Sequence, residues 1–466
     1  MIEIKNLRLR FPDAEEKRFT GLDITIKEKE KVLILGPSGS GKSTLLNVMG
    51  SLIPHAMEVP LKASVLNVPK NGAYVFQEPD SQFTMPSVAE ELAFVLENKS
   101  APVNGMEERI KTVLDTVGLD VDIRTTIDTL SGGMKQKLAV ASALLQNAET
   151  FFLDEPTSML DESAARNLWE TVGSIWDDKT VVIVEHRVDH IWDMVDRVIL
   201  MDDSGGITAD GAPGQILEEQ RALLDAFGVW HPYSWHRAPA PVSYDPGETL
   251  IRLEGLKITR GKRQILHADG ININKGEWVT VEGGNGSGKT SFLLAIMKLI
   301  KSDGRIHYRD RNITKTSEIA GDVYPVFQNP ELQFITHKVF DEVYINLELH
   351  FDKTEAMRQT GLILERMGLA PLSHLHPLEI STGQKRRLSV ATAAGGVPEV
   401  IMLDEPTFGL DQNHAFRLLE LFDEMVRQGT TVVMITHDEE IKKRYPSKRL
   451  MIEDGMLREK TGVENA

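Results

Sequence analysis

The strongest constraint on the fold is an internal repeat, because the 466-residue chain carries the same four motifs twice and in the same order. The lysines of the two glycine-rich loops are 247 positions apart, and the later motif pairs are 250 or 251 positions apart. A spacing this steady indicates that one domain of roughly 230 residues was duplicated. The paired segments are residues 36–44 with 283–291, VFQEPDSQF ending at Phe83 with VFQNPELQF ending at Phe334, residues 130–136 with 380–386, and residues 151–157 with 401–407.

The duplication predicts a first domain at residues 1–229 and a second at residues 249–466. Residues 230–248 between them are rich in proline and aromatic side chains, which favours an extended, semi-rigid linker. Short β-branched runs such as Lys31–Leu35 predict buried strands, and residues 43–49 and 290–298 predict helices. This alternation of strand, loop and helix predicts an α/β fold with a largely parallel sheet in each half.

Composition narrows the class of protein. Hydrophobic residues make up 41% and charged residues 26%, as in globular domains with substantial cores. No apolar run is long enough to span a membrane, and the N-terminus alternates like a strand, so we expect a cytoplasmic protein without a signal peptide. The net charge of −17 disfavours binding to nucleic acid or directly to anionic lipid. The lack of cysteine excludes disulfides, cysteine-ligated zinc and iron–sulfur clusters.

Both glycine-rich loops match the phosphate-binding pattern Gly-x-x-x-x-Gly-Lys-Ser/Thr. Each follows a predicted strand and opens a predicted helix, which aims backbone N–H groups and a helix N-terminus at a phosphate. Lys42 and Lys289 are predicted to reach the β- and γ-phosphates of ATP, and Ser43 and Thr290 to offer a hydroxyl to Mg²⁺. The predicted ATP-binding residues of the loops are Gly36, Pro37, Ser38, Gly39, Ser40, Gly41, Lys42, Ser43 and Thr44, with Gly283, Gly284, Asn285, Gly286, Ser287, Gly288, Lys289, Thr290 and Ser291.

Two adjacent carboxylates end an apolar run in each half. Placing two carboxylates at the end of a buried strand is costly unless they meet a cation or a proton. Asp154 and Asp404 therefore suit the Mg²⁺ shell, whereas Glu155 and Glu405 suit orienting or deprotonating the attacking water. The alternative, an exposed acidic turn, is disfavoured by the accompanying phosphate loops.

The order of these motifs resembles that of the ATP-binding-cassette ATPases, over nearly the whole chain and twice: a phosphate loop, FQ-x-P, SGG, LDEPT and a later histidine. The resemblance implies two tandem cassette domains, each with a RecA-like parallel-sheet core, an antiparallel β subdomain and a helical signature subdomain. It also implies an intramolecular, head-to-tail pseudo-dimer. Each ATP would be held by one domain's phosphate loop and by the other domain's signature.

By this resemblance, the signature residues cap the γ-phosphate of the ATP held at the opposite loop. Thr382 stands where the signature normally has its first glycine, and an added side chain there can crowd the backbone near the phosphate. Whether this slows the site built on Lys42 is left open by the sequence. The capping residues are Ser131, Gly132 and Gly133 for the ATP at Lys289, and Ser381, Thr382 and Gly383 for the ATP at Lys42.

The remaining roles implied by the resemblance come in pairs, one residue from each half. Phe11 is the candidate for stacking on adenine in the first half, and Arg260 could stack in the second. The pairs are the Q-loop glutamines Gln77 and Gln328, which contact Mg²⁺ and the attacking water, the D-loop aspartates Asp161 and Asp411, and the switch histidines His186 and His437, which contact the γ-phosphate.

Both Q-loops continue as FQ-x-P-x-x-Q-F, which resembles the energy-coupling-factor branch of vitamin and metal importers. A fused pair of domains looks most similar to importer ATPases for thiamine or its hydroxymethylpyrimidine precursor. This implies two partners, an integral membrane coupling subunit and a substrate-binding membrane subunit, and a place at the cytoplasmic face of the cell membrane. Phe83 and Phe334 are candidates to line a groove for the coupling subunit, whereas the stripe Val88, Leu92 and Leu96 is more typical of core.

Two other classes of protein stay open. A fused ATPase of a monosaccharide importer has a similar length and two cassettes, but it is not expected to carry the Q-loop extension twice. A soluble twin-cassette translation factor would have a basic linker for RNA, whereas residues 230–248 are aromatic and proline-rich with few charges. Fractionation separates these classes, because an importer subunit follows membranes and a translation factor follows ribosomes in a salt-sensitive way.

Overall fold

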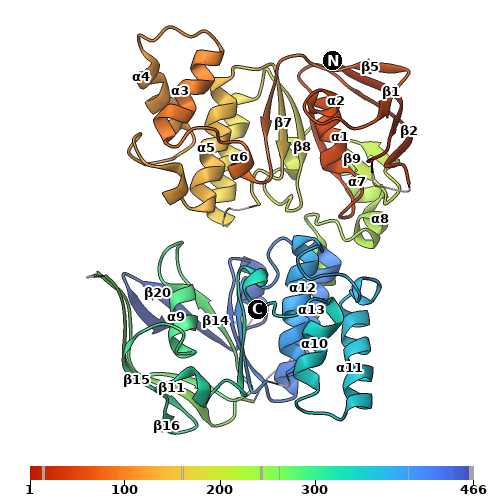
Figure 1. Ribbon diagram of the computed structural model, residues 1–466. Coiled ribbons are helices and arrows are strands. Elements are labelled where there is room, and N and C mark those ends of the chain that lie inside the picture. The colour runs from red at the N-terminus through yellow and green to blue at the C-terminus, as the bar shows by residue number, and fades with distance from the viewer. Residues whose placement is uncertain are drawn as a thin grey trace. The chain divides into compact units, whose positions relative to one another are not determined.

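The computed structural model describes residues 1–12, 16–158, 160, 162–241, 245–261, 263–396 and 398–460. It divides into two compact units, Met1–His236 with Asp411–Asn413, and Arg237–Leu410 with His414–Ala466. The division at His236 falls within the predicted linker, of which residues 242–244 lie outside the described ones. Figure 1 labels the main elements of each unit.

The first unit is built around a mostly parallel sheet. Its strands are β3 (Lys31–Leu35), β6 (Gly72–Val75), β7 (Thr150–Asp154), β8 (Thr180–Val184), β9 (Arg197–Met201) and β10 (Ile207–Gly211). They lie in the order β10-β9-β3-β8-β7-β6, and only the pair β10–β9 is antiparallel. Every residue of β7 and β8 is buried, as expected for central strands of a parallel sheet covered on both faces.

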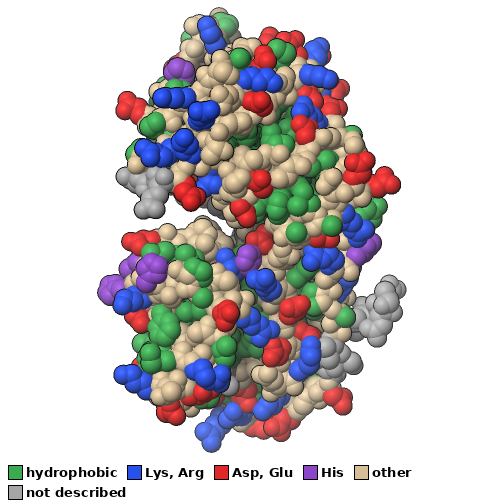
Figure 2. All heavy atoms as spheres, turned by 90° about the vertical axis from the view of Figure 1, so that its right-hand side faces the viewer, with side chains coloured by type: hydrophobic (Ala, Val, Ile, Leu, Met, Phe, Trp, Pro, Cys, Tyr) green, Lys and Arg blue, Asp and Glu red, His purple; other side chains and the backbone are tan. Residues whose placement is uncertain are grey.

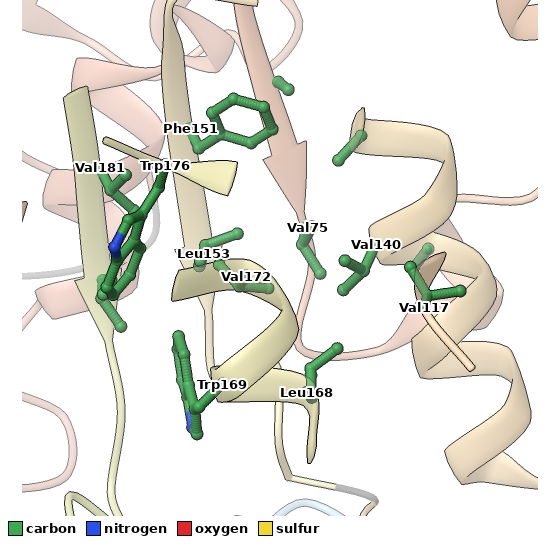
Figure 3. Packing of buried hydrophobic residues seen from close by; sticks show 14 of the residues in the cluster. Val75, Val117, Val140, Phe151, Leu153, Leu168, Trp169, Val172, Trp176 and Val181 are labelled. Carbon is green, nitrogen blue, oxygen red and sulfur yellow. The ribbon is translucent and has the colours of Figure 1, made fainter. Parts of the chain in front are cut away.

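Helix α6 (Glu162–Ile175) packs against this sheet. In Figure 3 its side chain Val172 lies beside Leu153 of β7, and Leu168 and Trp169 of the helix belong with Phe151 to the same hydrophobic cluster. Burying an aliphatic or aromatic side chain of this size stabilises a fold by about 1.5–3 kcal/mol. The packing therefore fixes β7 firmly, and with it the carboxylates at its end.

An antiparallel sheet and a helical subdomain complete the first unit. In the antiparallel sheet, β1 (Ile2–Leu9) pairs with β2 (Phe19–Ile26), β4 (Leu61–Lys62) and β5 (Val65–Asn67). The helical subdomain consists of α3 (Val88–Asn98), α4 (Met106–Thr116) and α5 (Gly132–Leu145), and the other helices are α1 (Lys42–Met49), α2 (Leu52–His55), α7 (Pro213–Glu219) and α8 (Arg221–Ala226). Val88, Leu92 and Leu96 of α3 are fully buried, so this stripe is core.

The second unit repeats the plan. Its parallel strands are β14 (Trp278–Glu282), β17 (Val323–Val326), β18 (Val400–Asp404), β19 (Thr431–Ile435) and β20 (Lys448–Glu453), in the order β20-β14-β19-β18-β17. The sheet continues through β21 (Met456–Glu459) into β11 (Thr249–Arg260), β12 (Arg263–Ala268), β13 (Ile271–Asn274), β15 (Asp303–Tyr308) and β16 (Arg311–Asn312). The helices are α9 (Lys289–Ile296), α10 (Val339–Leu347), α11 (Lys353–Arg366), α12 (Thr382–Gly395), α13 (Gln412–Arg427) and α14 (Glu439–Arg444).

The predicted fold class is confirmed, since each unit has a parallel-sheet core, an antiparallel β part and a helical subdomain. The helices predicted at residues 43–49 and 290–298 are observed as α1 and α9. Within the described ranges, no helix has the length and apolar character needed to cross a membrane. The head-to-tail pairing of the two domains stays a prediction.

Candidate nucleotide-binding sites

In each unit a glycine-rich loop connects a buried strand to a helix, from β3 to α1 and from β14 to α9. Gly41 and Gly288 cap these helices in the left-handed conformation, with φ of 97° and 101°. A side chain at Gly288 would also place its Cβ 2.8 Å from Cγ2 of Ile265. Glycine is therefore required by both the backbone conformation and the close contact. The result is a set of backbone N–H groups at a helix N-terminus, which is the setting of a phosphate site.

Each loop lysine lies folded over its own loop. Lys42 Nζ donates to the carbonyl oxygens of Gly36 and Pro37 at 2.8 and 2.9 Å. Lys289 Nζ donates to the first two carbonyls of its loop at 2.7 and 3.0 Å. Burial lowers the pKa of Lys42, and neighbouring carboxylates oppose this effect. Both ammonium groups are thus held at the mouth of a loop that can present them to a phosphate.

Two buried hydroxyl groups indicate whether the phosphates of a nucleotide fit these loops. Ser40 Oγ and Ser287 Oγ are buried and make no hydrogen bond with any described residue. Each loop thus combines an unpaired hydroxyl, a lysine ammonium and ordered backbone N–H groups. This donor set suits phosphate oxygens.

Asp154 and Asp404, at the ends of β7 and β18, lie beside the loops as predicted. Ser43 Oγ donates to Asp154 Oδ1 at 2.9 Å, and Thr290 Oγ1 donates to Asp404 Oδ2 at 2.7 Å. Burial raises the pKa of Asp154 to about 6 and also raises the pKa of Asp404. A hydroxyl and a buried carboxylate are hard oxygen ligands that suit Mg²⁺, and a cation would offset the cost of burying the carboxylate. Both pairs therefore fit a magnesium ion.

Glu155 gathers the predicted catalytic residues of the first unit. Gln77 Nε2 donates to Glu155 Oε2 at 2.7 Å, and His186 Nε2 lies 3.0 Å from Glu155 Oε1. Burial opposes ionisation of this carboxyl, but His186, Lys42 and Gln77 together outweigh burial, so the pKa of Glu155 is lowered. An ionised carboxylate held from both sides is well placed to orient a water molecule.

Glu405 occupies the equivalent place in the second unit but has different partners. Burial raises the pKa of Glu405 to about 8, and its Oε1 makes no hydrogen bond with the described residues. The backbone N–H of His437 donates to Oε2 at 3.3 Å, and His437 Nε2 lies 3.5 Å from Oε1. Gln328 lines the same cavity as Glu405 and His437. The structure thus brings these three together without the tight bonding seen around Glu155.

A cavity of about 260 Å³ opens at the second loop. It gathers six of the nine predicted residues of the loop together with the predicted metal-binding and catalytic residues of this unit, which supports a single site there. The predicted residues that line it are Asn285, Gly286, Gly288, Lys289, Thr290, Ser291, Gln328, Asp404, Glu405 and His437, joined by Arg260, Ile265 and Ile435.

The predicted signature residues begin helices α5 and α12. Ser131 and Ser381 cap these helices, and each side chain accepts a hydrogen bond from the backbone N–H three residues further on. Thr382, the first residue of α12, is exposed, and neither it nor Gly132 has a positive φ. Threonine is therefore accommodated at this position without backbone strain. Gly133 and Gly383 are the second residues of the two helices.

Two other predicted residues, Phe11 and Asp411, are among the described ones. Phe11 is half-buried and packs against a core cluster of the first unit. Asp411 belongs, with Gln412 and Asn413, to the first compact unit. Asp161 lies outside the described residues. The roles of all three stay predictions.

Sequence reasoning missed three buried charged residues that shape the Q-loops. Glu91 and Glu342, 3% and 1% exposed, each accept two backbone N–H groups from the turn after the Q-loop glutamine. Arg386 donates to the backbone of the second Q-loop. The two glutamates recur 251 positions apart, which could have drawn attention to them. Their burial, however, depends on tertiary contacts that no local pattern shows.

Comparisons with known proteins agree with this geometry. A family model described as ABC transporter matches residues 19–158 and 266–408. A candidate HMP/thiamine import ATP-binding protein, YkoD of Bacillus subtilis (strain 168), is 32% identical, with 97% of this chain and 90% of the relative covered. A candidate ABC transporter ATP-binding protein of Streptococcus pneumoniae serotype 4 is 31% identical, with 98% and 90% covered.

Solved structures show the same fold. The RNase-L inhibitor structure has a TM-score of 0.68 at 21% identity, covering 97% of this chain and 89% of that one. The archaeal ribosome recycling factor aABCE1, solved with the ribosomal stalk protein aP1, has a TM-score of 0.67 at 22% identity, covering 94% and 87%. Two matched family segments and full-length relatives above 30% identity place the chain in a family. The protein belongs to the ABC transporter family, as an ATPase that joins two ATP-binding cassettes in one chain and uses ATP with Mg²⁺.

Proposed function

We propose that this ATPase powers a membrane importer for a vitamin or related micronutrient, with thiamine or its hydroxymethylpyrimidine precursor as the first candidate. The observation that carries the proposal is the Q-loop extension, which is present in both units and held by a buried glutamate in each. The Bacillus subtilis relative, whose name refers to HMP/thiamine import, supports the substrate class. The partners would be a coupling subunit and a substrate-binding subunit in the membrane, with this chain at the cytoplasmic face.

Hydrolysis in this proposal is divided among the residues of each site. The loop lysines and N–H groups hold the phosphates, and Mg²⁺, when bound, neutralises charge on the phosphate oxygens. Glu155 or Glu405 orients a water molecule and takes its proton while the water oxygen attacks the γ-phosphorus. The bond from that phosphorus to the β–γ bridging oxygen breaks, which leaves ADP and phosphate. The Q-loop glutamines and switch histidines keep the water and the γ-phosphate aligned.

The two ATP sites are proposed to be composite, each completed by the signature of the other cassette. The site at Lys289 would then be capped by Ser131 and its two glycines, and the site at Lys42 by Ser381 and Thr382. Binding of two ATP molecules would close the pseudo-dimer, and hydrolysis would reopen it through repulsion between the products. The Q-loops would carry this movement to the membrane subunits.

The surface after each Q-loop is the proposed docking site for the coupling subunit. Phe83 and Phe334 are half-buried there, and in the second unit Leu332 and Ile335 are 74% and 77% exposed. Apolar side chains this exposed, beside a catalytic glutamine, fit a partner that would bury them.

The rival classes are less well supported. The archaeal ribosome recycling factor is similar to this chain in fold, at 22% identity. On the face drawn in Figure 2, acidic and basic side chains are interspersed, whereas an RNA-binding face would gather basic residues. A monosaccharide importer would not be expected to have both Q-loop extensions.

The test is to tag the chain, solubilise membranes in mild detergent, and identify co-purifying proteins by mass spectrometry. Two small polytopic proteins, one a coupling subunit and one of vitamin-binding type, are expected. A permease pair with a periplasmic-type binding protein would favour the sugar importer. Ribosomal proteins alone would contradict a transport function.

A further inference from the structure

The two signature helices differ at one buried position. In α12 the residue is Arg386, 6% exposed, and the equivalent residue of α5 is Gln136, 0% exposed. Neither Nε2 nor Oε1 of Gln136 makes a hydrogen bond in the described part of the chain. The first unit therefore buries an unpaired amide where the second unit buries a cation. Burying a cation is costly unless hydrogen-bond acceptors or negative charges compensate it.

The guanidinium of Arg386 bridges two catalytic segments of its own unit. Nη1 donates to the carbonyl oxygen of Glu405, and Nη2 donates to the carbonyl oxygen of Gln328 at 2.9 Å. Cζ of Arg386 lies 5.7 Å from the ring centroid of Phe408, three residues beyond Glu405. A planar guanidinium holds its donors in a fixed fork, so two different nitrogens can each donate to a separate acceptor in a defined geometry. One side chain thus joins the signature helix, the Q-loop and the end of β18.

The bond to Glu405 acts on an unusual backbone conformation. Glu405 has φ of 52°, in the left-handed region, which costs on the order of 1 kcal/mol or more for a residue with a side chain. Its carboxylate accepts a 3.3 Å hydrogen bond from the backbone N–H of His437 at Oε2, whereas Oε1 makes no hydrogen bond among the described residues. Glu155, by contrast, is held through its carboxylate by Gln77 at 2.7 Å.

The main chain of Glu405 is held by its own N–H, which donates to the carbonyl of Ile435, and by its carbonyl, which accepts from the Phe408 N–H. Arg386 adds a side-chain restraint to this carbonyl that the first unit does not have among its described residues.

Two further hydrogen bonds connect the Q-loop of the second unit to α12. Lys385 Nζ donates to Glu331 Oε1 at 2.6 Å, and Ser389 Oγ donates to Gln333 Oε1 at 2.6 Å. The first unit keeps an equivalent of the lysine bond, but Ala139 stands where Ser389 stands. The restraint by Arg386 is thus part of a more tightly connected Q-loop.

We propose that Arg386 is a positioning residue for ATP hydrolysis at the site built on Lys289. By fixing the backbone of Glu405 and the Q-loop to the signature helix, it holds the glutamate where an attacking water needs it. The inference rests on the proposed role of Glu405 as the residue that orients this water. Arg386 donates to Glu405 and Gln328 and to no residue of the phosphate loop in the described ranges, so its loss affects turnover and not nucleotide binding.

The experiment uses the full chain with Glu155→Gln, so that turnover depends on Glu405. Arg386→Gln copies the residue of the first unit, and it is expected to lower kcat roughly 10- to 100-fold. KM for MgATP is expected to stay within about twofold, because the phosphate loop is untouched. Arg386→Lys keeps the positive charge but replaces the rigid fork with a single donor nitrogen, so its kcat is expected to fall between the kcat of the Glu155→Gln parent and that of Arg386→Gln.

Arg387→Gln is the matched control. Arg387 is the next residue, 8% exposed, and its Nη1 donates to the carbonyl of Met367, away from Glu405. It is expected to lower the melting temperature while kcat stays within about twofold. The proposal is wrong if Arg386→Gln leaves kcat equal to that of the Glu155→Gln parent or raises only KM. It is also wrong if Arg386→Gln lowers kcat no more than Arg387→Gln does.

Two further outcomes are decisive. If Arg386→Gln does not fold, the proposal is overturned by an Arg386→Lys variant whose kcat equals that of the Glu155→Gln parent. Turnover that survives in the variant Glu155→Gln/Glu405→Gln would instead remove the role of Glu405 itself, and that result is distinguishable because it does not involve Arg386.

Discussion

Glu155 and Glu405 occupy the same backbone position in two copies of one domain, yet they differ in how readily they bind a proton. Burial opposes ionisation of both. At Glu155 this is outweighed by His186, Lys42 and Gln77, which lower its pKa, whereas burial raises the pKa of Glu405 to about 8. The chemistry of a duplicated residue is therefore set by its neighbours and not by its identity.

Glu405→Gln is expected to cost more turnover than Glu155→Gln. In the proposed pairing, Glu405 serves the site at Lys289, whose cap is the unaltered Ser131 with its two glycines, whereas Glu155 serves the site capped by Thr382. We expect Glu405→Gln to remove roughly 90% of kcat and Glu155→Gln less than about half. Steady-state ATP hydrolysis measures both, with nucleotide binding as the control. Equal losses, or the reverse order, would contradict the asymmetry.

Glu185 predicts a pH dependence of stability. It is 3% exposed, accepts hydrogen bonds from Thr157 Oγ1 and from the backbone N–H of His186, and burial raises its pKa to about 8. Because the folded pKa lies above the ordinary value of 4.5, its contribution to stability is fully present below about pH 4.5 and is lost as the pH rises through about 8. The loss should be on the order of a few kcal/mol.

Glu185→Gln isolates this effect, because the amide imitates the protonated acid and does not titrate. The melting temperature of the parent protein should fall more steeply than that of the variant between about pH 4.5 and pH 8, the interval over which the contribution of Glu185 is lost. The two proteins should melt at similar temperatures at the acidic end. Parallel melting curves over the whole range would show that Glu185 does not titrate in this window.

At the scale of elements, the parts of the site that could be predicted are those that local sequence determines. A strand, a glycine-rich loop and a helix are contiguous in the chain, so α1, α9 and the loop lysines were located correctly from sequence. Asp154 and Asp404 are predicted to share Mg²⁺ with Ser43 and Thr290 because of their chemistry, and the structure places each carboxylate within hydrogen-bond distance of its hydroxyl. Arg386 could not be predicted, because its partners lie 19 and 58 residues away and only the folded chain brings them together.

The Q-loop turn gives a prediction at this scale. Glu342, at the start of α10, accepts the backbone N–H groups of Ile335 and Thr336, so Glu342→Ala leaves both donors unpaired. Hydrogen exchange at these two amides should accelerate by at least about tenfold, and recovery of membrane partners should fall. Glu348→Ala, at an exposed position at the end of the same helix, is the control. Unchanged exchange at residues 335 and 336 would show that the carboxylate does not hold the turn.

The proposed docking surface after the second Q-loop gives another prediction at the scale of elements. Phe334→Glu places a charge on the proposed contact with the coupling subunit, where its desolvation on binding would be costly. Recovery of the membrane partners should fall by roughly tenfold or more, while ATP binding stays intact because Phe334 is not a cavity-lining residue. Leu349→Glu, 72% exposed beyond the end of α10, is the control for an added charge on the same helical subdomain. Unchanged assembly of Phe334→Glu would remove Phe334 from the proposed interface.

At the scale of the whole molecule, the duplicated halves have kept one set of residues and changed another. The loop lysines and the hydroxyl–carboxylate pairs at Asp154 and Asp404 have equivalent contacts in both units. The halves differ at Thr382 in the predicted cap, at Arg386 in the proposed restraint on Glu405, and at Glu185, which precedes the predicted switch histidine His186. This pattern fits two sites that both bind MgATP but turn it over at different rates.

The proposed pairing of each phosphate loop with the opposite signature can be tested with two double variants of the full chain. Lys42→Ala/Ser381→Arg places both changes in one composite site, so turnover should match that of Lys42→Ala alone. Lys42→Ala/Ser131→Arg damages both sites, so turnover should fall by a further factor of roughly 100. Ser131 and Ser381 both cap helices, so each arginine should cost a similar amount of stability, about 1 kcal/mol, and melting temperatures check this match. The opposite result is that Lys42→Ala/Ser131→Arg matches Lys42→Ala and Lys42→Ala/Ser381→Arg loses the further turnover. Each loop would then work with the signature of its own cassette, and the head-to-tail arrangement would be wrong.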